Sequence, residues 1–135
     1  PPVDPDPDPD PPADAGTCKG RAATVTVGAD GVFRGTSGAD VIAGTEGNDA
    51  IRPGGGDDLV CAGDGNDKVS AGSGNDTVIA GGGNDKVKGG GGKDKLKGGG
   101  GNDRLSGGGG KDKLSGGPGK DRCAAKGGDR LKGCE

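Results

Sequence analysis

The chain has 135 residues, about the length of one domain, yet Val, Ile, Leu and Phe supply only 18 of them while Gly supplies 36. A charged chain with less than about 20% of these apolar residues is expected to be disordered unless something other than a hydrophobic core stabilises it. The absence of His, Trp, Tyr and Met argues against imidazole catalysis and against recognition of nucleobases by stacking.

Charge is distributed unevenly along the chain. Residues 1–85 hold 15 acidic and 5 basic side chains, whereas residues 86–135 hold 6 acidic and 13 basic ones. The two parts therefore carry −10 and +7, which gives the net charge of −3.

The N-terminal residues divide into a linker and a cap. Residues 1–16 alternate Pro with Asp, which predicts a disordered, extended and acidic linker of about 3.1 Å per residue. Residues 17–34 contain a strand-like stretch, and Phe33 lies nine residues before Ile42, which indicates a degenerate repeat that caps the array. No apolar run near 18 residues exists, so no membrane span is expected.

Ten consecutive nine-residue units occupy residues 35–124, among them "AGSGNDTVI" and "AGGGNDKVK". Position four is always Gly: Gly38, Gly47, Gly56, Gly65, Gly74, Gly83, Gly92, Gly101, Gly110 and Gly119. Position six is always Asp: Asp40, Asp49, Asp58, Asp67, Asp76, Asp85, Asp94, Asp103, Asp112 and Asp121. Position eight is apolar: Ile42, Ile51, Val60, Val69, Val78, Val87, Leu96, Leu105, Leu114 and finally Cys123.

One inward residue per nine predicts short strands joined by tight glycine turns, not helices. Two units then make one coil, which predicts an all-β, right-handed parallel β-roll with two short parallel sheets and about five coils of 18 residues. After Cys123 the register slips by one residue, and residues 125–135 are expected to form a C-terminal cap.

Stacking places equivalent aspartates of successive coils about 4.8 Å apart along each edge. Two carboxylates at that distance repel by about 1 kcal/mol in water and by about 3.5 kcal/mol at an effective dielectric of 20. A divalent cation would reverse this repulsion. Oxygen ligands from carboxylates and turn carbonyls suit calcium better than magnesium, and the absence of His disfavours zinc.

The units match "GGxGxDxUx", so the chain resembles the RTX (hemolysin-type) calcium-binding β-rolls of secreted bacterial proteins. Its capped ends, with Cys18 in "TCKGRAATVTV" and the closing "KGCE", resemble those of short secreted actinobacterial proteins of this kind. The resemblance implies that the ten position-six aspartates bind calcium together with carbonyls of the glycine turns, the position-four glycines included. It implies several ions, at most about eight. The expected function is calcium binding by a secreted, non-enzymatic module that folds outside the cell when it binds calcium.

Position five varies in a way that predicts unequal sites. It is usually Asn or Asp, but it is Ala39 in the first unit and Lys93, Lys111 and Lys120 later. We expect tighter calcium binding on the edge that runs from Asp49 to Asp103. Around Asp94, Asp112 and Asp121 we expect weaker binding or none, with a lysine ammonium group in place of the ion.

The four cysteines suggest disulfides and an oxidising compartment, although free thiols remain an alternative. Three pairings are possible, and the positions favour Cys18–Cys61 and Cys123–Cys134, the second of which would fasten the last coil.

Position seven of alternate units is basic and predicts a row on one sheet face: Lys68, Lys86, Arg104 and Arg122, with Lys88 beside it. The row is either a solvated face that prevents sheet aggregation or a site for an anionic cell-surface polymer. The alternative function is therefore cell-wall adhesion, and nucleic acid is not an expected partner.

Overall fold

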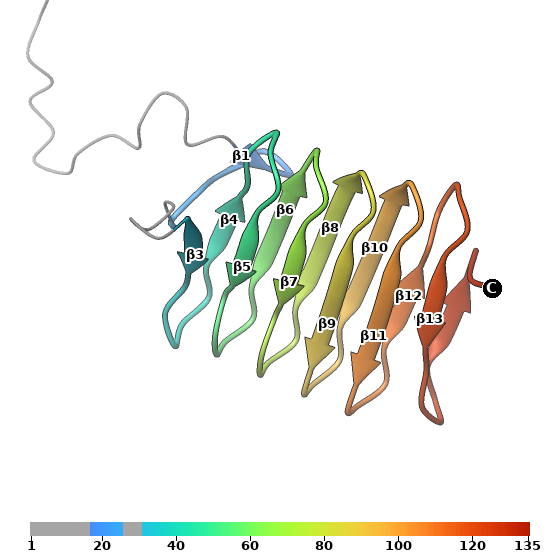
Figure 1. The fold of residues 1–135 in the computed structure, drawn as a ribbon. Coiled ribbons are helices and arrows are strands. Elements are labelled where there is room, and N and C mark those ends of the chain that lie inside the picture. Colours follow the sequence, from blue (N-terminus) through green and yellow to red (C-terminus); the bar gives the residue numbers. More distant parts are fainter. Residues whose placement is uncertain (1–16, 26–30) are drawn as a thin grey trace, which may run out of the picture.

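The computed structural model describes residues 17–25 and 31–135, which form a parallel β-solenoid without a helix (Figure 1). The acidic linker expected at residues 1–16 and part of the expected N-terminal cap, residues 26–30, lie outside the described residues. The described residues include no helix that is long and apolar enough to cross a membrane.

Fourteen strands are present in the described residues, and most are three to six residues long. In chain order they are β1 (Thr17–Cys18), β2 (Arg21–Ala22), β3 (Val32–Arg34), β4 (Val41–Ala43), β5 (Ala50–Arg52), β6 (Leu59–Gly63), β7 (Lys68–Ser70), β8 (Thr77–Gly82), β9 (Lys86–Gly90), β10 (Lys95–Gly100), β11 (Arg104–Gly108), β12 (Lys113–Ser115), β13 (Arg122–Ala124) and β14 (Arg130–Lys132).

Strands alternate between two six-stranded parallel sheets, so each coil contributes one strand to each sheet. We call the sheet of β4, β6, β8, β10, β12 and β14 sheet 1, and the sheet of β3, β5, β7, β9, β11 and β13 sheet 2. In most pairs, residues 18 positions apart face each other, for example Leu96 with Val78.

The predicted two-sheet roll is confirmed, but it has about six coils where five were expected. Both ends add a degenerate unit: β3 pairs with β5 through Phe33, and β14 pairs with β12 through Leu131. The slip after Cys123 shortens the last unit by one residue and still leaves Leu131 in register with Leu114.

The core is a single row of apolar side chains between the two sheets. The position-eight residues from Ile42 to Leu114 are buried, and Cys123 packs against them while half-buried. Phe33 and Val25, which is bridged to Ile42, close the N-terminal end of this row. Ala62, Ala71 and Ala80, at position one of their units, fill the space between larger neighbours with fully buried methyl groups.

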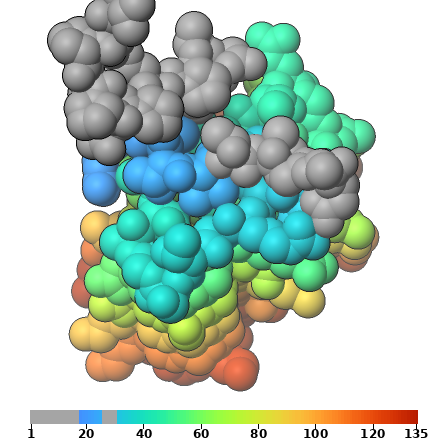
Figure 2. Space-filling view, turned by 90° about the vertical axis from the view of Figure 1, so that its left-hand side faces the viewer, coloured from blue at the N-terminus to red at the C-terminus, as the bar shows by residue number. Residues whose placement is uncertain are grey.

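A short hairpin covers the outer face of sheet 1 at the N-terminal end. β1 and β2 pair antiparallel, and Cys18 is buried against Val41 and Leu59. The view along the solenoid from this end shows residues 17–25 (blue) lying across the first coils, with the later coils behind them (Figure 2).

Both favoured disulfides are present. Cys18 is bonded to Cys61 of β6, and Cys123 of β13 is bonded to Cys134, so no described cysteine is free. The first fastens the hairpin to the outer face of sheet 1, and the second fastens the C-terminal residues to the last strand of sheet 2.

Candidate metal-binding turns

The aspartates of position six form two inward-facing columns, one along each edge of the roll. Residues six and eight of a unit point to the same side of an extended segment, because side chains alternate along a strand. All ten carboxylates are therefore buried beside the apolar core, with at most 8% of any residue exposed. Edge 1 carries the aspartates that precede the strands of sheet 1, beginning with Asp40, and edge 2 those that precede the strands of sheet 2, beginning with Asp49.

One oxygen of each carboxylate joins neighbouring coils. From Asp58 onward, Oδ1 accepts the backbone N–H of the aspartate one coil earlier, at N···O distances of 2.7 to 2.9 Å. The column continues on edge 1 to Asp129, whose Oδ1 accepts the N–H of Asp112 at 2.9 Å. Asp129 thus takes the position-six place in the shortened last unit, which the sequence analysis did not assign.

The other oxygen has no partner in eight of the ten aspartates. Buried Oδ2 atoms without a hydrogen bond occur in units three to ten: Asp58, Asp67, Asp76, Asp85, Asp94, Asp103, Asp112 and Asp121. Leaving a buried polar group unpaired costs about 1 to 3 kcal/mol, and more for a charged one. Eight such atoms in two regular columns are placed where a positively charged group could satisfy them.

The first two units differ because position two is Thr instead of Gly. Thr36 donates its N–H to Oδ2 of Asp40 at 2.6 Å, and its hydroxyl lies 3.1 Å from the same oxygen. Thr45 donates its N–H to Oδ2 of Asp49 at 2.7 Å and its hydroxyl to Oδ1 at 2.8 Å. These two carboxylates are satisfied by their own turns.

Glycine at positions two and four lets backbone carbonyls of adjacent coils approach the turn. At Gly56, where φ is 96°, a Cβ would lie 2.6 Å from the carbonyl oxygen of Gly38 in the previous coil. At position one, a Cβ on Gly98 would collide with Oδ2 of Asp103 and lie 2.8 Å from the carbonyl oxygen of Gly116. A carboxylate oxygen and a carbonyl oxygen of the next coil therefore face the same small space.

Burial makes these carboxylates weak acids. Desolvation, followed by the charges of aspartates in the same column, raises the pKa of Asp67 and Asp76 to about 7 against the opposing effect of a backbone hydrogen bond. Burial likewise raises the pKa of Asp94 and Asp103 to about 6. The ionised form is therefore costly in the folded chain without a cation.

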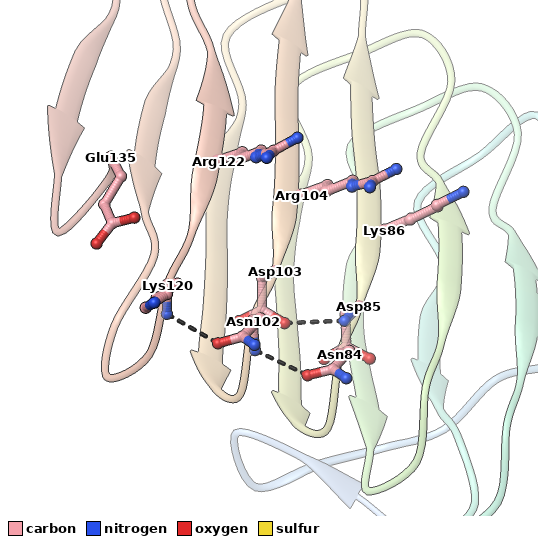
Figure 3. Close-up of a pocket in the computed structure, with 9 residues that line it drawn as sticks. All are labelled: Asn84, Asp85, Lys86, Asn102, Asp103, Arg104, Lys120, Arg122 and Glu135. Carbon is pink, nitrogen blue, oxygen red and sulfur yellow. Dashed lines mark hydrogen bonds between the residues drawn. The ribbon is translucent and has the colours of Figure 1, made fainter.

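Position five has a structural role that the sequence analysis missed. Along edge 2 the side chains are exposed, and Oδ1 of each Asn accepts the backbone N–H of the residue one coil later, as from Lys120 to Asn102 at 2.9 Å. Figure 3 shows this ladder beside the aspartate column. On edge 1, Lys93 donates its backbone N–H to Oδ1 of Asn75, but the lysine side chain has no acceptor for the N–H of the next coil. Unequal calcium affinity between the edges stays a prediction.

The donor set of these turns fits calcium and does not fit zinc. No site in the described part of the chain gathers three or more Asp, Glu, His or Cys side chains, so backbone carbonyls would have to complete the ligand shell. Calcium takes six to eight oxygen ligands, carbonyls included, in flexible geometry. The unpartnered Oδ2 atoms and converging carbonyls supply oxygen only, and all four cysteines are in disulfides.

The fold and the aspartate columns define a parallel β-roll built from nine-residue turn-and-strand units. The RTX calcium-binding nonapeptide repeat model matches residues 27–60, 34–69, 62–96, 88–123 and 97–131. Together these matches span most of the sequence, and the chain belongs to this family. No curated protein and no solved structure gave a match.

Proposed function

We propose that the eight aspartates with an unpartnered Oδ2 bind calcium in the turns, and that Asp40 and Asp49 do not. The observation that carries this proposal is the set of buried, unbonded carboxylate oxygens, which begins where Gly replaces Thr at position two. When bound, the ion supplies the positive charge and the oxygen affinity that the protein itself lacks there. The proposal narrows the ten ligands expected from the sequence to eight.

We further propose that calcium binding drives folding. Each coil adds two buried aspartates, one on each edge, and each lies next to the position-six aspartate of the neighbouring coil. Stacking the coils without a cation therefore brings like charges together. A cation that binds the folded chain better than the unfolded one stabilises the fold by mass action. An unfolded chain passes an export channel more readily than a folded one, and calcium outside the cell then completes folding.

We propose an extracellular, non-enzymatic role. The two disulfides fit an oxidising compartment, in which they form and persist. The chain has no His to activate its serines, so nucleophilic catalysis has no general base of that type.

The test is a count of bound ions. Calorimetric titration and native mass spectrometry of the disulfide-intact chain should give up to eight calcium ions. Magnesium should bind more weakly, because it requires a smaller and more rigid octahedral shell. Binding of fewer than two ions, or equal binding of both metals, would contradict the proposal.

A second candidate function is attachment to an anionic polymer through the outer face of sheet 2. Strand register aligns Lys68, Lys86, Arg104 and Arg122 in one exposed row, as the sequence predicted. In Figure 3 the side chains of Lys86, Arg104 and Arg122 point the same way. Retention on an anionic matrix that weakens as salt increases would support this function, and retention that does not depend on salt would contradict it.

A further inference from the structure

Sheet 1 carries a second basic face that the sequence analysis did not identify. Over β10, β12 and β14, the parallel register aligns Lys95, Lys113 and Arg130 in one exposed row. A second row, formed by Lys97 and Lys132 with a serine between them, runs beside it. The outward residues of these three strands include no acidic side chain.

Each basic face has an open trough beside its main basic row. On sheet 1 the trough is lined by both rows and ends at Leu131, and on sheet 2 a similar trough lies between the row of Lys86 and Arg104 and the side chain of Lys88. The rows cross the strands, so both troughs run along the axis of the solenoid. A linear ligand could follow this direction over several coils.

The two faces lie on opposite sides of the roll, because the apolar core separates the sheets. They share the C-terminal coils. Over the first coils the outer face of sheet 1 is instead covered by the β1–β2 hairpin, where Cys18 packs on Val41 and Leu59. The N-terminal end therefore leaves only the later strands of sheet 1 open to a ligand.

Within the described residues no ion pair involves these basic rows, and one exposed acid, Glu135, lines a pocket at one end of the sheet 2 row with Arg104 and Arg122. Like charges directly opposite each other on neighbouring strands destabilise a sheet. Lys95 and Lys113 are such a pair on sheet 1, and Lys86 and Arg104 on sheet 2. A polyanion lying along the trough would relieve this repulsion at every coil, and release of its counterions would strengthen binding.

We propose that the chain is bivalent: each basic face binds one strand of a linear anionic polysaccharide, so one roll bridges two polymer chains. This rests on the second candidate function and extends it from one face to two. A nucleic acid is the poorer partner, because the single aromatic residue, Phe33, is buried and cannot stack on bases.

Dextran sulfate is a suitable probe, with unmodified dextran as the uncharged control. The calcium-loaded chain is captured on immobilised dextran sulfate, and a fluorescent soluble form of the same polymer is then added. The wild-type chain should bind the surface and capture the second polymer. Unmodified dextran should do neither.

Two variants remove one face each. Lys95→Thr with Lys113→Thr changes sheet 1, where Thr77 already occupies the adjacent place in the same row, and Lys86→Thr with Arg104→Thr changes sheet 2. Each should still bind the surface but lose most capture of the soluble polymer. Each single-face variant should also lower the slope of log affinity against log salt by about 0.7 for each charge removed, and combining all four substitutions should abolish both surface binding and capture.

The outcomes separate the claims. Circular dichroism and a calcium count confirm that each variant is folded and loaded, and a variant that fails either is replaced by its Lys→Gln and Arg→Gln counterpart. A folded wild-type chain that does not bind the surface would refute the second candidate function. Surface binding without capture of the second polymer, or capture by both single-face variants at the wild-type level, would refute bivalency alone.

Discussion

The substitution Asp76→Asn should have opposite effects on stability with and without calcium. Asp76 lies between Asp58 and Asp94 in the column of edge 1: its Oδ1 accepts the N–H of Asp58, and its N–H is donated to Asp94. Its Oδ2 has no partner. Asparagine keeps an oxygen for the N–H of Asp58 and removes the negative charge.

Without calcium, at about pH 8, the change relieves repulsion from two neighbours at about 4.8 Å, worth about 2 kcal/mol in water and about 7 kcal/mol at an effective dielectric of 20. The new amide N–H lacks an acceptor, which costs about 1 to 3 kcal/mol. Because the three carboxylates are buried, the figure at an effective dielectric of 20 applies, and the net gain in unfolding free energy should be about 4 to 6 kcal/mol. With calcium at about one hundred times its dissociation constant, loss of one ion should cost about 2.7 kcal/mol.

Asp40→Asn is the matched control, because Thr36 already satisfies Oδ2 of Asp40. It should leave the ion count unchanged and destabilise the chain by up to about 3 kcal/mol in both conditions, through loss of a hydrogen bond to a charged group. The assay is circular dichroism in calcium and in chelator, with a folding osmolyte titrated to bring the metal-free chain through its transition. If Asp76→Asn weakens the metal-free chain, or if both variants lose an ion, the reasoning is wrong.

Three further predictions concern the turns and the last coil. Thr45→Gly removes the hydroxyl contact to Asp49 and lets position two take the positive φ of the later units, which should turn this backbone N–H away from Oδ2 of Asp49 and add one ion to the count by native mass spectrometry. An unchanged count would refute closure of this turn by threonine. The pKa of Asp67 and Asp76 is raised to about 7, so the folded metal-free chain binds more protons than the unfolded chain. In chelator, its β-sheet signal in circular dichroism should therefore increase as the pH falls from about 8 to about 5. In limiting calcium the sheet signal should decrease over the same pH range, because protons displace the ion. A change in the same direction in both conditions would contradict the assignment. Loss of the Cys123–Cys134 bridge in a double Cys→Ala variant should destabilise the last coil by about 3 kcal/mol, seen as faster amide exchange in β13 than in β9.

The strict nine-residue period was sufficient to predict the two sheets, the inward row and the aspartate columns. Side-chain alternation fixes these features once Asp and the apolar residue are two positions apart. The sequence predicts the unit at Phe33 as a degenerate repeat, whereas it predicts the unit at Leu131 only as a cap because its turn departs from the pattern. Both strands pair in register, and together they make the sixth coil.

Finer features depended on hydrogen-bond directions that a repeat pattern does not encode. Thr36 and Thr45 look like tolerated variants of Gly, but each directs its N–H to a carboxylate in its own turn. The sequence pattern associates Asn at position five only with tighter calcium binding, and in the structure its Oδ1 accepts a backbone N–H from the next coil. The signal that could have separated the first two units was the consistent Thr at position two.

The most direct test of the calcium-driven fold is far-ultraviolet circular dichroism of the disulfide-intact chain at fixed ionic strength, in chelator and in millimolar calcium. The eight unpartnered carboxylate oxygens predict little sheet signal in chelator and a cooperative gain of sheet signal as calcium is added. A full sheet signal in chelator, unchanged by calcium, would show that the disulfides and the backbone ladders hold the roll without an ion.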